Sequence, residues 1–308
     1  MRTILICTYY GLRESLRLAA DQLEKLGWQV EDHPLFLDTN LDAKIRLTNP
    51  DVILFWSYNI DPSYLKQIKA NFNDKKFVIF NWDDPFSWSW SNIKQIAGIF
   101  DLALTSCQEA TKWYLERGAR QSEFLLPGFT PAPLEVDKRY ICDVAICITN
   151  LYENNNVYPN QKINRKKLID LLVASGLDFR IYGPGDLKEI YPNHYHGFVN
   201  YSDLPKVFYN TKINICTHVD SRYKYTNERS ILITGSSGLL LVDPIHDYDQ
   251  IFNPGQECLQ LDLDDPISQI KTILAHYDEY ANIKEKGYNK ALTNYTWADW
   301  ATKVNKLI

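Results

Sequence analysis

The sequence lacks a transmembrane segment, a secretory signal peptide and the strongly basic charge of proteins that bind nucleic acid without specificity. No segment approaches the ~18 consecutive apolar residues that a membrane-spanning helix needs. The amino terminus, MRTILICTYYG, has too short an apolar run for a secretory signal peptide. The net charge is -5, so the chain has no large basic field that would attract nucleic acid or an anionic membrane without specificity. We therefore expect a cytoplasmic protein with no transmembrane segment.

Cysteine and histidine are sparse and scattered. The six cysteines form no Cys-x-x-Cys pair and fall mostly inside strand-like runs such as ICDVAICI and KINICT, so we expect reduced core residues. His194 and His196 have a spacing that suits a metal, but no third ligand accompanies them. The acidic run DLDD at 262–265 precedes a helical pattern and is expected to cap that helix. No bound metal or cofactor is predicted.

Apolar strand-like runs alternate with amphipathic helical patterns twice along the chain. The proline-rich stretch LPGFTPAPLEVDKR at 126–139 separates the two series and fits neither helix nor strand. Repeated strand-helix alternation predicts parallel sheets covered by helices. The predicted fold class is therefore α/β, with two Rossmann-like, doubly wound domains. We place the domains at residues 1–130 and 140–290, followed by a carboxy-terminal helical tail over 291–308.

In open sheets of this kind, ligands collect at the carboxyl ends of the strands. In the first half, these positions are aromatic or acidic, which suits a hydroxyl-rich acceptor. The candidates for acceptor binding are Tyr10, Gly11, Tyr58 and Trp82. Asp83 and Asp84 are the candidate general bases, with a slight preference for Asp83. Both aspartates also precede a proline, which is a common turn signal, so a purely structural role for them stays open.

The corresponding positions of the second half contain glycines, helix starts and a cation. The stretch TNERSILITGSSGLLLVD at 226–243 shows this pattern most clearly. Thr226 or Asn227 can cap a helix that carries Arg229 in its first turn. Gly235 and Gly238 are expected to end that helix before a buried strand. A helix start with a cation beside it is suited to holding an anion such as a phosphate.

Six motifs occur, from about residue 177 onward, in the order found in GT-B glycosyltransferases. They are FRIYGPG (179–185), HGFVNYSDLPKVFYNTKINIC (196–216), NER (227–229), GSSGLLLVD (235–243), IFNPGQE (251–257) and IKEKGYNKALTNYTWADWA (283–301). The sequence most closely resembles the spore-maturation CgeB-like group, whose proteins carry an Asp-Pro segment similar to NWDDP at 81–85. This resemblance implies two Rossmann-like domains that face each other across a cleft. The acceptor would bind in the first domain and the donor in the second, and the tail would cross back onto the first.

The resemblance also implies a set of donor-binding residues. In such enzymes, the donor diphosphate lies at a helix start beside an Arg or Lys that stabilises the leaving group. Arg229 and the backbone of Asn227 match that position. Arg165 resembles a second basic contact, and Tyr182, Gly183 and Gly185 match the loop near the nucleotide base. Glu228 and His218 complete the donor-binding candidates, His218 because it follows the strand-like run KINICT. For His218, an acid-base role and a purely structural role stay open.

The sequence departs from the family pattern at one position of the donor helix. In many members this helix carries a glutamate that binds sugar or ribose hydroxyls, and here the position is Leu232, with Glu228 one turn earlier. The predicted function is a metal-independent hexosyltransferase that uses a nucleotide-diphosphate sugar, UDP-sugar by default, as co-substrate. A catalytically silent carbohydrate- or nucleotide-binding module, which Leu232 favours, and a nucleotide-sugar epimerase stay open as alternatives.

The acceptor is expected to bear a hydroxyl group. A glycan, a protein and a small molecule all meet this requirement. The negative net charge disfavours nucleic acid, although a modified nucleobase of DNA remains an alternative. The sequence does not indicate an oligomeric state.

Overall fold

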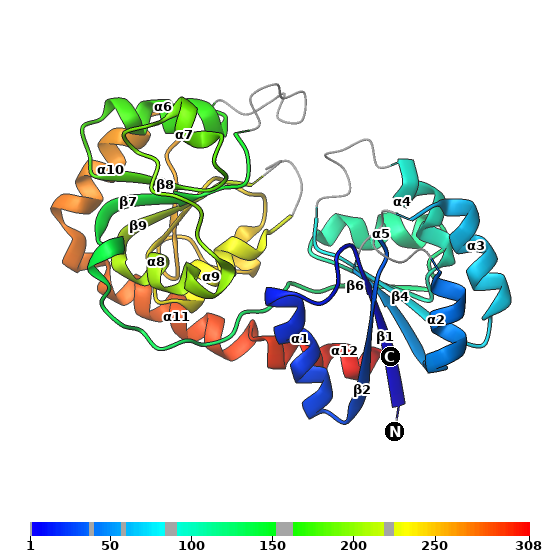
Figure 1. Ribbon diagram of the computed structural model, residues 1–308. Helices are drawn as coiled ribbons and strands as arrows, with labels where there is room; N and C mark the ends of the chain where they lie inside the picture. Colours follow the sequence, from blue (N-terminus) through cyan, green and yellow to red (C-terminus); the bar gives the residue numbers. More distant parts are fainter. Residues whose placement is uncertain (1, 37–39, 57–59, 84–90, 152–162, 219–224) are drawn as a thin grey trace. The chain divides into compact units, whose positions relative to one another are not determined.

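The computed structural model describes residues 2–36, 40–56, 60–83, 91–151, 163–218 and 225–308 (Figure 1). The chain forms two compact units, each built on a parallel β-sheet. Unit 1 comprises Met1–Gly128, Tyr225–Asn227 and Trp297–Ile308, and unit 2 comprises Phe129–Lys224 and Glu228–Thr296. Within the described residues, no helix has both the length and the apolar character needed to span a membrane.

Unit 1 contains a six-stranded parallel sheet with the strand order β2-β1-β3-β4-β5-β6. Its strands are β1 (Arg2–Thr8), β2 (Trp28–Pro34), β3 (Val52–Phe55), β4 (Lys76–Asn81), β5 (Leu102–Thr105) and β6 (Gln121–Phe124). Its helices are α1 (Glu14–Lys25), α2 (Leu41–Thr48), α3 (Pro62–Asn71), α4 (Ser91–Ile96), α5 (Gln108–Glu116) and α12 (Trp297–Leu307), with the 3-10 turn η1 (Ala97–Ile99). The strand order reverses between β1 and β3, and ligands bind beside such switch points in open α/β sheets.

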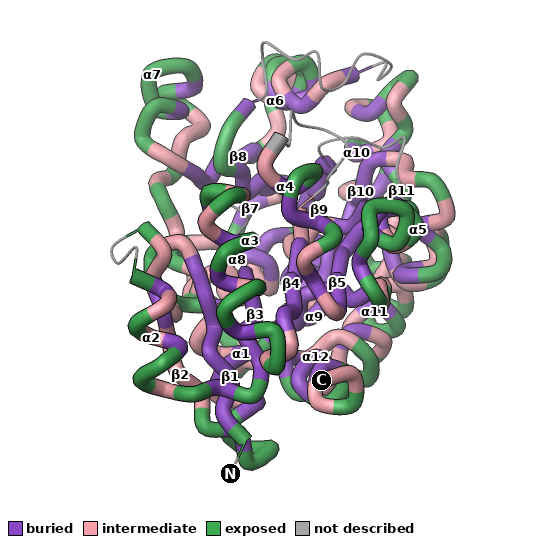
Figure 2. The backbone as a smooth tube through the Cα atoms, turned by 90° about the vertical axis from the view of Figure 1, so that its right-hand side faces the viewer, coloured by how far each residue is buried: buried purple, intermediate pink, exposed green. Residues whose placement is uncertain are grey.

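The last helix of the chain completes the core of unit 1. Trp297, Trp300 and Val304 of α12 share one buried cluster with α1 and with strands β1, β3 and β4. Asn305 of α12 accepts hydrogen bonds at 2.9 Å from both the Arg2 guanidinium and the Trp28 indole. The central strands are buried, as Figure 2 shows, which explains their continuous apolar sequences.

Unit 2 contains a five-stranded parallel sheet with the order β11-β10-β9-β7-β8. Its strands are β7 (Cys142–Cys147), β8 (Phe179–Tyr182), β9 (Thr211–Cys216), β10 (Leu240–Val242) and β11 (Leu259–Gln260). Its helices are α6 (Arg165–Ala174), α7 (Leu187–Ile190), α8 (Leu204–Asn210), α9 (Glu228–Gly235), α10 (Pro266–Ala275) and α11 (Ala281–Asn294), with the 3-10 turns η2 (Lys138–Tyr140), η3 (Tyr201–Asp203), η4 (Tyr248–Gln250) and η5 (Tyr277–Tyr280). The switch point of this sheet lies between β7 and β9.

Two local predictions from the sequence are confirmed. Asp265 accepts a hydrogen bond from the Ser268 backbone and caps α10, so the acidic run has the capping role expected of it. All six cysteines lie in the described part of the chain and are buried as thiols.

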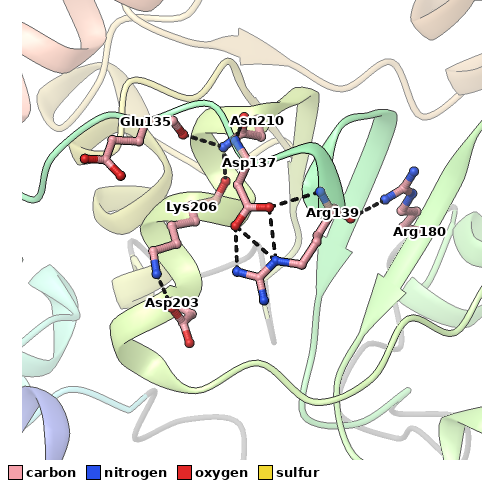
Figure 3. A network of polar contacts seen from close by, with 7 residues as sticks. All are labelled: Glu135, Asp137, Arg139, Arg180, Asp203, Lys206 and Asn210. Atoms are coloured by element: carbon pink, nitrogen blue, oxygen red, sulfur yellow. Dashed lines mark hydrogen bonds and ion pairs between the residues drawn. The ribbon is translucent and has the colours of Figure 1, made fainter.

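The proline-rich segment after unit 1 is a docked part of unit 2 (Figure 3). The Asn210 side chain on α8 accepts the Asp137 N–H at 2.9 Å and donates to the Glu135 carbonyl at 3.0 Å. Arg180 on β8 donates to the Arg139 carbonyl at 2.7 Å. The segment predicted as a linker is therefore held by hydrogen bonds to α8 and β8.

The glycines after α9 serve packing rather than backbone conformation. A Cβ on Gly235 would lie 2.5 Å from the Phe129 ring, and one on Gly238 would lie 2.8 Å from the Phe208 carbonyl oxygen. The left-handed residue at this helix end is Ser237, with φ 54°. The predicted helix end is confirmed, but close contacts rather than a left-handed φ explain why both residues are glycine.

Candidate functional site

Arg165 is the first residue of α6 and lies at the switch point of the unit 2 sheet. Its guanidinium donates to Oγ1 and to the carbonyl of Thr217, at 2.7 and 3.0 Å, and to the Asn150 carbonyl at 2.9 Å. The residue is only 6% exposed. Asn164 caps α6 by accepting the Lys167 N–H, which fixes the start of this helix. The predicted second basic contact is thus a buried side chain bonded to its own chain.

His218 follows β9 and is held by Asp243, the residue after β10. The His218 N–H donates to Oδ2 of Asp243 at 2.9 Å, and the ring Nδ1 lies 2.7 Å from Oδ1. The His218 side chain has 0% exposure. Asp243 was not among the predicted site residues, although an acidic residue directly after the apolar strand GLLLV was a signal for it.

Glu228 and Arg229 form the first turn of α9 and are partly exposed. The Tyr201 hydroxyl donates to Oε1 of Glu228 at 2.6 Å, a contact that the sequence did not predict. Burial raises the pKa of the Cys147 thiol to about 12, and the Arg229 charge opposes this shift. Arg229 therefore lies within electrostatic reach of the carboxyl end of β7.

The rest of α9 is core. Residues 230–235 are all buried, and Leu232 is 5% exposed. In this helix, only the first turn offers a carboxylate at the surface, and that carboxylate belongs to Glu228. Asn227, the residue before Glu228, belongs to unit 1. The chain therefore passes from unit 1 to unit 2 within the segment 227–229 that is predicted to bind the donor diphosphate.

The predicted loop near the nucleotide base begins with a packed tyrosine. Tyr182 is buried against the rings of Tyr140 and His196, and burial raises its pKa to about 12. Gly183 follows in close contact with the end of β7, and Gly185 is exposed with open space around it. Tyr182 is thus the last residue of β8, and the two glycines form the loop that directly follows this strand.

Gly183→Ala is expected to lower the free energy of unfolding by about 3 kcal/mol. A Cβ at this position would lie 2.3 Å from the Ile148 carbonyl oxygen and 2.7 Å from Cδ1 of Leu187, so the end of β7 must shift. Urea unfolding measures the change. Gly185→Ala is the matched control, because no atom lies within 4 Å of its added Cβ. Equal effects of the two substitutions would contradict the close contact.

Three aromatic side chains meet at the carboxyl ends of β1 and β2 in unit 1. The Tyr10 ring lies 4.4 Å from Tyr9 and 5.4 Å from Phe36, and Tyr9 lies 5.0 Å from Phe36. Tyr10 is 49% and Phe36 57% exposed. The Phe36 N–H donates to the Tyr9 carbonyl at 3.0 Å, which keeps the two segments paired beyond the strands. We call Tyr9, Tyr10 and Phe36 the aromatic platform.

Gly11 forms the turn that follows the two aromatic residues after β1. Its φ is 97°, a left-handed conformation that favours glycine, and its N–H donates to Oγ1 of Thr8 at 2.7 Å. The turn fixes the backbone that carries Tyr10. Phe36 was missed because it joins Tyr10 only through the pairing of β2 with β1.

Two further unit 1 candidates, Trp82 and Asp83, follow β4. The Trp82 ring packs against Trp56 at 5.8 Å and Trp297 at 6.5 Å, and its carbonyl accepts the Ser106 hydroxyl at 2.7 Å. Trp82 is therefore part of the aromatic core on the α12 face. Asp83 is partly buried, and its N–H donates to the Asn81 side chain at 3.1 Å. Tyr58 and Asp84 lie outside the described residues.

The comparisons with known proteins concern both the sequence and the fold. Residues 165–306 match the family model described as glycosyl transferase-like. No curated protein shows significant similarity to the chain. Many solved structures share the fold, and three of them illustrate the similarity. HepE from Anabaena, in complex with UDP and glucose, has a TM-score of 0.71 and 11% identity, over 100% of this chain and 99% of that chain.

The other two structures are similar over nearly their full lengths. Sucrose-phosphate synthase from Thermosynechococcus elongatus has a TM-score of 0.73 and 11% identity, over 100% of this chain and 98% of that chain. A glycosyltransferase from Rickettsia africae has a TM-score of 0.67 and 13% identity, over 99% and 97%. The chain thus has the fold of GT-B glycosyltransferases, two parallel-sheet α/β domains, and the predicted fold class is confirmed. The narrower CgeB-like resemblance and the cytoplasmic location stay predictions.

Proposed function

We propose that the protein is a glycosyltransferase that moves a sugar from a nucleotide-diphosphate sugar, UDP-sugar by default, to a hydroxyl-bearing acceptor. The observation that carries this proposal is the partly exposed first turn of α9, where Arg229 and Glu228 stand at the start of a helix beside the sheet. The glycosyl transferase-like match over residues 165–306 supports it. The fold is shared with HepE, whose structures contain UDP or UDP-glucose.

The chemistry of α9 suits the donor. The first N–H groups of the helix and the Arg229 guanidinium bind the diphosphate and stabilise its charge as the sugar leaves. This cationic site takes the part that a metal ion would otherwise play, so we propose that no metal or other cofactor is required. Glu228 accepts hydrogen bonds from donor hydroxyls, with Tyr201 holding its carboxylate.

The acceptor chemistry is assigned to unit 1. The aromatic platform and the turn at Gly11 bind the acceptor, since flat rings pack against the apolar face of a sugar. Asp83 or Asp84 takes the proton of the attacking hydroxyl. A glycan, a protein or a small molecule can supply that hydroxyl.

A second candidate function is a silent binding module, which the buried Leu232 favours because the second turn of α9 carries no carboxylate. A thermal-shift screen against UDP, GDP, ADP, CMP, TDP and their sugars tests for a donor site. A ligand at ~100 times its Kd stabilises the folded state by about 2.7 kcal/mol. Product analysis then separates the functions: transfer releases free nucleotide, epimerisation gives an isomeric sugar, and a silent module gives neither.

Tyr10→Ala and Phe36→Ala are each expected to raise the acceptor KM about 5-fold while leaving the Kd for UDP unchanged. The physical reason is the loss of one ring from the aromatic platform, worth about 1 kcal/mol of stacking. Steady-state kinetics with a glycosyl acceptor and calorimetry with UDP measure the two quantities. Leu47→Ala is the control, since Leu47 is an 81% exposed residue of α2. An unchanged acceptor KM in both variants would remove the platform from the acceptor site.

A further inference from the structure

Arg165 occupies a position that suits ligand binding, yet at least three of its five N–H donors are used by the protein. It stands between the carboxyl ends of β7 and β9, where open α/β sheets bind ligands. Its Nε, Nη1 and Nη2 nevertheless bond to Thr217 and Asn150, and the residue is more than nine-tenths buried. Two of the three acceptors are backbone carbonyls, one beyond the end of each strand. A rigid guanidinium fork is suited to holding such acceptors at a fixed separation.

The end of β9 is held from its other side as well. Thr217 bonds to Arg165 of α6. The next residue, His218, bonds through both its backbone N–H and its ring to Asp243, which directly follows β10. Thr217 and His218 are therefore held by two different elements, α6 and the end of β10, just beyond the strand end nearest the switch point.

We propose that Arg165 is a positioning residue that holds Thr217 at the donor site, and that it makes no direct contact with the donor diphosphate. The inference rests on the proposed function. Arg165 is only 6% exposed, so its remaining N–H groups could reach a diphosphate only if the side chain moved. That movement would break its bonds to the Thr217 and Asn150 carbonyls, and a buried carbonyl without a partner is costly. Arg229, in the partly exposed first turn of α9, is the cation that meets the diphosphate.

The test compares loss of the positive charge at position 165 with loss of the hydrogen bonds between the guanidinium fork and Thr217. Arg165→Met removes both, Arg165→Lys keeps the charge but not the fork, and Thr217→Val removes the bonded hydroxyl alone. We expect each to weaken UDP binding about 10-fold, and the double variant Arg165→Met with Thr217→Val to bind no more weakly than Arg165→Met. Lys167→Met is the control, because it removes a charge from the exposed face of the same helix.

The salt dependence of UDP affinity separates positioning from direct contact. A cation that touches the diphosphate contributes to this dependence because salt screens the attraction. We expect the slope of log Kd against log salt concentration to be unchanged in the Arg165 and Thr217 variants and reduced in Arg229→Gln. A reduced slope in Arg165→Met, with full affinity in Arg165→Lys and Thr217→Val, would overturn the proposal. If Arg165→Met does not fold, Arg165→Lys and Thr217→Val decide the question. A wild-type protein that binds no nucleoside diphosphate would instead overturn the proposed function, and with it the positioning role of Arg165 at a donor site.

Discussion

Arg229→Ala is expected to raise the Kd for UDP and for the UDP-sugar about 100-fold, a loss of about 2.7 kcal/mol. The reason is that a guanidinium in the first turn of a helix makes charge-assisted hydrogen bonds to phosphate, and the helix start adds to the same field. Isothermal titration calorimetry measures both ligands. Circular dichroism of the ligand-free variant shows whether the fold is kept.

Arg229→Lys is the matched control for charge. Lysine keeps the positive charge but loses the planar fork, so the expected loss of UDP affinity is about 10-fold. Uridine, which has no phosphate, should bind the wild type and both variants equally. If Arg229→Ala left the Kd for UDP unchanged, the diphosphate would have to bind at another part of the chain.

Trp300→Ala is expected to lower the free energy of unfolding by about 4 kcal/mol. Trp300 is 2% exposed and stacks on Trp56 at 5.1 Å, with 18° between the ring planes. Its removal leaves a large cavity between α12 and the sheet of unit 1. Urea unfolding, followed by circular dichroism, measures the change.

The same helix provides the control for Trp300. Lys306 is exposed, and Lys306→Ala should change the free energy of unfolding by less than about 0.5 kcal/mol. A loss of less than about 1 kcal/mol in Trp300→Ala would show that α12 contributes little to the core of unit 1.

The central strands were predictable because both of their faces are covered. The sequence VILF of β3 is buried throughout, so it forms a continuous apolar run that stands out from its surroundings. The edge strands β2 and β6 are less regular. QSEF in β6 contains no apolar run, because the strand is paired on one side only and is partly exposed. Its place in the sheet depends on pairing with β5, which the sequence does not display.

The candidate site was predictable only where one short segment determines it. The segment 227–229 indicates a helix start with a cation, and the structure places Glu228 and Arg229 in the first turn of α9. The contact of Tyr201 with Glu228 joins residues 27 apart, and that of His218 with Asp243 joins residues 25 apart. Such pairs arise when separate strands and helices pack together. The burial of Arg165 has the same origin, since its partners lie on other segments.

The position of α12 determines the order in which the two units are completed during protein synthesis. Translation reaches Trp297 and Trp300 only after all of residues 129–296 have been made. The nascent unit 1 therefore lacks its last core residues until the end of synthesis. Unit 2, in contrast, is one block of sequence that is interrupted only by Tyr225–Asn227, which belong to unit 1. Domains usually fold in the order of their synthesis, and here the order of completion is reversed. A stop codon between positions 297 and 300 would leave the second unit whole and the aromatic core of the first unit exposed.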